Sequence, residues 1–160
     1  MTEIHQLHVE DELKNCSADQ FYSFLKNDMT TLPQVCPHMF KSFEILAGDG
    51  KSAGTIWIVK FATGTSHEEM VKEKIVAMDD ESRTISFSII EGDLLRKFPK
   101  VDYTMTVTPI VTQEGREKSC LVKMCAKYEK QNEDTPPPHE YMEMTSFMNK
   151  AIASHLANKT

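Results

Sequence analysis

Between residues 46 and 61, two apolar runs flank a loop that holds three of the six glycines, Gly48, Gly50 and Gly54. The second run contains Trp57, the only tryptophan. Because glycine adopts positive φ without a steric cost, this pattern predicts two antiparallel strands joined by a hairpin. Further strands and one long helix follow this hairpin, and a sheet of this kind can curve around a helix and leave a hollow between them.

The first 35 residues predict one strand and two short helices. Residues 4–14 alternate in polarity, which is typical of a half-buried strand. Ser17 and Gln20 have the spacing of a capping box ahead of apolar Phe21, so we expect a short helix that ends near Asn27. Residues 29–35 predict another helical turn or two, limited in length by Pro33 and Pro37.

Six more strands are predicted in quick succession, with polar turns at residues 79–82 and 113–116. Such closely spaced hairpins favour an antiparallel sheet. The expected strands cover residues 40–45, 55–61, 70–78, 83–90, 101–107 and 121–128.

A run of three prolines at residues 136–138 ends the strand pattern. From His139 to about Asn158 the apolar residues follow a helical period, with Tyr141, Met144 and Met148 on one stripe. A helix of ~20 residues is roughly 30 Å long, enough to cross a seven-stranded sheet.

Composition favours one domain over residues 1–160, which is large enough to bury a core. A formal net charge of −6, with no cluster of basic residues, argues against nucleic acid as a partner. No apolar run approaches the roughly 20 residues of a membrane-spanning helix, and no signal peptide is recognisable, so we expect no membrane insertion and a cytoplasmic location. The four cysteines should then be reduced.

Several segments together resemble the birch-pollen-allergen superfamily, and within it the major latex proteins. The glycine loop at residues 48–54 sits where the family has its glycine-rich loop. Residues 90–94, Ile-Glu-Gly-Asp-Leu, resemble its "EGD plus apolar" segment, and residues 128–130, Tyr-Glu-Lys, resemble the end of its last strand. Pro33 and Pro37, which precede the second strand, also fit. The gate and latch sequences of the related abscisic-acid receptors are absent, so that receptor mechanism is not expected.

The resemblance implies the α+β helix-grip fold: a seven-stranded curved antiparallel sheet wraps around a long C-terminal helix, and two short helices lie between strands one and two. It also implies a large internal cavity that the helix closes. Parity and helical spacing then predict the lining residues. These are Trp57, Val59, Phe61, Phe87, Ile89, Tyr103, Met105, Tyr141, Met144, Met148 and Ile152. The glycine loop is expected at the mouth of this cavity.

Other site chemistries have weaker support in the sequence. The glycine loop precedes a strand and lacks a GK[ST] ending, so a hairpin is favoured over a phosphate cradle. His67 and the other histidines lack the spacing of a metal site, and no metal or cofactor is expected. Five residues remain as candidate acid, base or catalytic groups, although ordinary exposed positions are favoured for each. They are Tyr103, Glu91, Lys123, Asp102 and Asp11.

Three functions are therefore open. The leading hypothesis is a binding protein that sequesters a small hydrophobic molecule, such as a steroid-like compound, fatty acid, flavonoid, alkaloid or hormone, with plant defence among the roles that the resemblance implies. The alternative is a cofactor-independent enzyme of plant specialised metabolism that uses the same cavity for condensation, elimination, isomerisation or cyclisation. The third is a partner-binding protein with an exposed apolar patch near the glycine loop and Pro33. A monomer or weak dimer is expected.

Overall fold

The structure is a computed structural model, and it describes residues 3–62, 70–111 and 117–158. The seven strands of the described residues are β1 (Ile4–Lys14), β2 (Phe40–Ala47), β3 (Ile56–Phe61), β4 (Met70–Asp79), β5 (Thr84–Gly92), β6 (Lys100–Val111) and β7 (Glu117–Glu129). The helices are α1 (Ala18–Asn27), the 3₁₀ turn η1 (Met29–Thr31), α2 (Leu32–Val35), α3 (Leu94–Lys97) and α4 (His139–Ala157).

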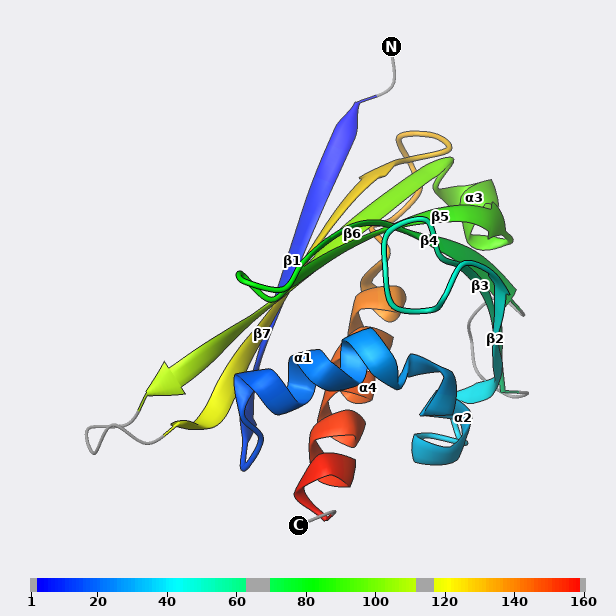
Figure 1. Cartoon of the computed structure of the whole chain (residues 1–160). Helices are drawn as coiled ribbons and strands as arrows, with labels where there is room; N and C mark the ends of the chain where they lie inside the picture. The colour runs from blue at the N-terminus through cyan, green and yellow to red at the C-terminus, as the bar shows by residue number, and fades with distance from the viewer. Residues whose placement is uncertain (1–2, 63–69, 112–116, 159–160) are drawn as a thin grey trace.

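The strands form one antiparallel sheet in the order β1-β7-β6-β5-β4-β3-β2. All neighbours except β1 and β7 are consecutive in the chain, which is the result expected from a series of hairpins. Figure 1 shows the sheet curving over α4, while α1 and α2 lie at the open end of the curve. The predicted α+β helix-grip fold is therefore confirmed.

The concave face of the sheet and one side of α4 form the core. Alternate residues of each central strand are buried, as a half-buried pleated sheet requires. Opposite them, α4 buries Tyr141, Met144, Met148 and Ile152. Helix α4 also contacts β1, α1 and α2. The space between sheet and helix is thus filled by side chains from six or more elements.

Helix α1 begins as its sequence predicts. The backbone N–H of Gln20 donates to Ser17 Oγ at 3.1 Å, and the Ser17 N–H donates to Gln20 Oε1 at 2.9 Å, so the capping box is complete. The Tyr22 hydroxyl donates to Asp80 at 2.7 Å and Lys26 pairs with the same carboxylate at 2.6 Å. These contacts attach α1 to the turn between β4 and β5.

The glycine loop joins β2 to β3 as predicted, and positive φ explains its glycines. Gly48 has φ +86°, and a Cβ there would lie 2.7 Å from Thr55 Cα. Gly54 has φ +96° with open space around it. At Gly54 the backbone conformation alone therefore requires glycine, whereas at Gly48 the backbone conformation and the lack of space both require it.

Helix α3, one turn between β5 and β6, was not predicted. Its signal in the sequence is weak, because four residues cannot display a helical period. The predicted turn at residues 113–116 and His67 lie outside the described residues. In the described part of the chain, no helix is both long and apolar enough to cross a membrane.

Candidate functional site

A small cavity of about 30 Å³ lies between the sheet and α4. Water needs roughly 10–15 Å³ by this measure, so the cavity has room for about two molecules of that size. Its walls are apolar apart from one carboxyl, two phenols and one hydroxyl. The lining residues are Met29, Leu32, Phe40, Phe43, Val59, Phe61, Glu73, Phe87, Tyr103, Met105, Tyr141, Met144, Thr145 and Met148.

The carboxyl belongs to Glu73, which the sequence analysis did not single out. On β4, Val71, Glu73 and Ile75 share one parity and all three are buried. The alternation that buries the two apolar neighbours therefore also turns Glu73 toward the interior. Glu73 lies directly opposite Trp57 of β3 and Ile89 of β5, in the middle of the sheet.

Three donors from three elements surround the Glu73 carboxyl. Tyr103 of β6 donates to Oε2 at 2.5 Å, and the Trp57 indole N–H donates to the same oxygen at 3.3 Å. The Tyr141 hydroxyl of α4 lies 3.5 Å from Oε1, the upper limit for a hydrogen bond. One carboxyl oxygen is therefore well satisfied and the other is nearly free to accept.

Burial governs the ionisation of this cluster. Removal from water raises the pKa of Glu73 above its ordinary value, while the hydrogen bonds from Tyr103, Trp57 and Tyr141 act in the opposite direction. Burial, followed by the nearby Glu73 carboxyl, also raises the pKa of Tyr103 well above its ordinary value. The group therefore keeps its protons at pH values where an exposed glutamate has already lost its own.

Aromatic rings complete the wall beside the carboxyl. Phe87 stacks on Tyr103 with centroids 4.8 Å apart, because the two residues face each other across β5 and β6. Tyr141 meets Tyr103 edge-on at 6.2 Å. Trp57 contacts Phe43 and Phe87 at 4.9 and 6.1 Å. These contacts hold the rings in fixed orientations around the polar group.

The structure brings most of the predicted ligand-binding residues to this cavity. The eight that line it are Val59, Phe61, Phe87, Tyr103, Met105, Tyr141, Met144 and Met148. Trp57, Ile89 and Ile152 are buried in the same core but do not line the cavity. Beside the glycine loop, Ile45 and Leu46 are 41% and 51% exposed.

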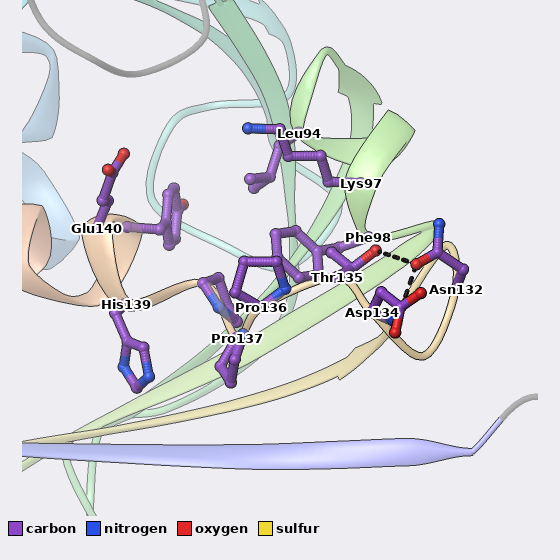
Figure 2. Close-up of a pocket in the computed structure, with 12 residues that line it drawn as sticks. Leu94, Lys97, Phe98, Asn132, Asp134, Thr135, Pro136, Pro137, His139 and Glu140 are labelled. Atoms are coloured by element: carbon purple, nitrogen blue, oxygen red, sulfur yellow. Dashed lines mark hydrogen bonds between the residues drawn. The ribbon is translucent and has the colours of Figure 1, made fainter.

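A larger hollow of about 530 Å³ opens on the surface at the start of α4. Figure 2 shows Leu94 and Lys97 on one side of it and the segment from Asn132 to His139 on the other. The turn in this segment is held by Asn132 Oδ1, which accepts from the Asp134 backbone N–H at 3.0 Å and from the Thr135 hydroxyl at 3.2 Å. Tyr141 lines both this hollow and the interior cavity.

Of the five candidate catalytic residues, only Tyr103 lines the cavity. Three others are exposed or half-buried on the opposite face of the sheet. There Glu91 pairs with Lys72 at 2.9 Å, Asp102 accepts from Ser88 at 2.6 Å, and Lys123 lies 4.0 Å from Glu10.

The fifth candidate, Asp11 of β1, is buried and contacts α4. Asp11 Oδ2 accepts from Asn149 Nδ2 at 3.2 Å, and neither residue lines the cavity. Across the described ranges, no three His, Cys, Asp or Glu side chains lie close enough to hold a metal ion.

A curved antiparallel sheet around one long helix, with a few polar groups in an apolar interior, defines a helix-grip protein. The profile of the "Pathogenesis-related protein Bet v 1 family" matches residues 4–159, and the chain belongs to this family. It is 31% identical to major latex protein 146 of Papaver somniferum, over 96% of this chain and 91% of that protein. The predicted resemblance to the major latex proteins is confirmed.

Two solved structures are similar over nearly their whole length. Major latex-like protein 151 from Panax ginseng superposes with a TM-score of 0.82 at 22% identity, covering 95% of this chain and 97% of that one, and shows the fold. Norcoclaurine synthase from Thalictrum flavum, solved in complex with dopamine and hydroxybenzaldehyde, has a TM-score of 0.81 at 26% identity, covering 99% and 90%.

Proposed function

We propose that this protein binds a small hydrophobic molecule in the interior between the sheet and α4 and sequesters it from water. The observation that carries the proposal is the Glu73–Tyr103–Tyr141 cluster facing an otherwise apolar cavity. Burying an ionisable group opposes folding, so a core selected only for stability would have an apolar residue at this position. Ligand pockets, by contrast, combine apolar walls with a few polar groups that orient the ligand.

Binding requires the interior to open. The cavity of about 30 Å³ is far smaller than the roughly 300–1,000 Å³ of typical ligand pockets. Four methionines line it, Met29, Met105, Met144 and Met148, and the flexible thioether side chain adapts to new shapes. A rotation of Tyr141 would join the cavity to the surface hollow of about 530 Å³ and provide a route inward.

Burial of apolar surface would drive binding. At about 25 cal/mol per Å², burial of about 400 Å² of ligand surface contributes about 10 kcal/mol. Part of this is offset by the cost of ordering the ligand and the side chains around it, and the remainder corresponds to an affinity on the order of micromolar. The ligand class stays open among the hydrophobic compounds predicted from the sequence. We place this activity in the cytosol, where the four cysteines, none of which forms a disulfide in the structure, would remain reduced.

The test is native mass spectrometry of the protein after incubation with a lipophilic plant extract. A specific mass adduct is expected, and Met148→Trp, which fills the cavity, should reduce it at least tenfold. Phe147→Trp is the matched control, because this neighbouring side chain is 56% exposed and lies outside the cavity. Equal adducts in both variants would place the ligand elsewhere and refute the proposal.

A cofactor-independent enzyme is the second candidate, and Glu73 is the observation that favours it. A cavity-facing carboxyl whose pKa is raised by burial is suited to exchange a proton with a bound substrate. The likeness to norcoclaurine synthase supports the same idea. Profiling the extract before and after incubation separates the two functions. Loss of one compound and appearance of an isomer or condensation product, both abolished in Glu73→Gln, would make this protein an enzyme.

A further inference from the structure

In the part of the chain that the structure describes, the only charge that the residues lining the interior cavity can carry is negative. Among the described residues that line the cavity, Glu73 carries the only carboxyl, and none is Lys, Arg or His. The cavity wall is therefore either neutral or negative. An anionic ligand would meet repulsion from a carboxylate without any compensating cation, whereas a cationic ligand would supply the missing positive charge.

The geometry of the carboxyl leaves a place for a donor. Oε2 accepts from Tyr103 at 2.5 Å and from Trp57 at 3.3 Å, but Oε1 has only the 3.5 Å contact with Tyr141. The titratable groups that contact Glu73 are these two tyrosines, one from β6 and one from α4. Trp57 of β3 and Ile89 of β5 face it without charge. An incoming N–H group would thus find one carboxyl oxygen with unused acceptor capacity.

The rings beside this oxygen also suit a cation. Phe87, Tyr103 and Tyr141 pack together at centroid distances of 4.8 and 6.2 Å next to the carboxyl. Aromatic faces attract ammonium groups and stack with aromatic ligands. A carboxyl combined with such rings recognises a charged head and an aromatic body at the same time.

We propose that Glu73 is the counter-ion for the protonated amine of an aromatic amine bound in this cavity. The inference rests on the proposed function and specifies its ligand. The ammonium donates a hydrogen bond to Oε1, and the body of the ligand lies against the aromatic and methionine walls. Where Glu73 is a neutral acid before binding, it loses its proton to the solvent as the ammonium enters, so a neutral acid and a cation become an ion pair plus one released proton.

Three probes of matched size test the proposal: 2-phenylethylamine, 2-phenylethanol and 3-phenylpropanoate. Isothermal titration of the full chain from pH 4 to pH 8, in two buffers of different ionisation enthalpy at each pH, gives each affinity and the number of protons released. We expect the amine to bind at least tenfold more tightly than the alcohol and the carboxylate to bind most weakly. Proton release should accompany the amine alone and fall as pH rises.

Glu73→Gln is the matching variant, since glutamine preserves the shape and loses the charge. It should lose at least tenfold in affinity for the amine, release no proton and bind the alcohol as the wild type does. Tighter binding of the alcohol or carboxylate to the wild type, or no binding of the amine, would overturn the inference even if the variant failed to fold. The proposed function would survive that result, because it is judged by the adduct from the plant extract and by comparing Met148→Trp with its Phe147→Trp control.

Discussion

Replacing Glu73 by glutamine should make the protein more stable, and increasingly so as the pH rises. Glutamine can occupy the same site, since its carbonyl oxygen can accept from Tyr103 and Trp57 while its amide N–H donates to the Tyr141 hydroxyl. At a pH below the ordinary glutamate pKa near 4.5, where wild-type Glu73 is protonated in both states, the two proteins should differ by no more than about 1 kcal/mol.

The direction in which wild-type stability changes with pH follows from the raised pKa of buried Glu73. Between the ordinary pKa and the raised one, the folded wild type holds a proton that the unfolded chain has released, so its stability falls as pH rises. The slope is about 1.4 kcal/mol for each pH unit in this window, and the glutamine variant lacks it. Above the raised pKa the two curves should run parallel again.

Urea unfolding at half-unit steps from pH 4 to pH 8 measures the difference between the two proteins. Glu91→Gln is the control, because Glu91 is exposed and pairs with Lys72 on the other face of the sheet. That variant should track the wild type within about 1 kcal/mol at every pH. A constant difference between wild type and Glu73→Gln across the whole range would refute the reasoning, since it would mean that burial does not perturb this carboxyl.

Three further predictions concern single contacts, each measured by urea unfolding at pH 7. Tyr103→Phe removes a 2.5 Å hydrogen bond to a buried carboxyl and should lower the free energy of unfolding by about 1–3 kcal/mol. Tyr141→Phe removes only a 3.5 Å contact and should lower it by less than about 1 kcal/mol. Equal losses of stability in the two variants would contradict the geometry. Gly54→Ala should lower the free energy of unfolding by about 1–2 kcal/mol through its positive φ alone. Gly48→Ala should lower it clearly more, because the added methyl would also lie 2.7 Å from the Cα of Thr55. A larger loss in Gly54→Ala than in Gly48→Ala would show that the loop relaxes around the methyl group. Ser17→Ala should cost about 1 kcal/mol by removing the cap of α1, and an unchanged midpoint would show that the cap contributes nothing.

Local patterns were sufficient to predict most of the fold. Strand β1 covers the predicted residues 4–14, and the other strands end within a few residues of their predicted bounds because each is delimited by polar turns, glycine or proline. The capping box at Ser17 marked the start of α1, and the triple proline marked the start of α4. The resemblance to a family supplied what local patterns could not, namely that the sheet closes around the helix.

Glu73 shows where sequence reasoning stopped. Its position on the same face of the strand as Val71 and Ile75 was a usable signal, since an ionisable residue on the buried face of a strand needs hydrogen-bond partners. Those partners, however, lie 16, 30 and 68 positions away in the chain, at Trp57, Tyr103 and Tyr141. Only the assembled sheet and helix bring them together, so a single sequence could not identify the cluster.

The volume of the cavity was equally beyond the sequence. Val59, Phe87 and Met148 line the cavity, yet whether such side chains leave space depends on how they fill it in three dimensions. In this structure they leave about 30 Å³. Because methionines form much of the wall, the interior can enlarge by rotation about side-chain bonds without rebuilding the sheet.

The stability of the protein and its proposed choice of ligand depend on the same proton of Glu73. The stability difference between wild type and Glu73→Gln stops growing when pH passes the raised pKa of the folded protein. Proton release on binding of an aromatic amine must cease at the same pH, because the carboxyl is then already ionised before the amine arrives. Unfolding and titration therefore report one pKa by independent routes. If the two upper limits differed by more than about one pH unit, the group that releases the proton would not be Glu73, and Glu73 would not be the counter-ion.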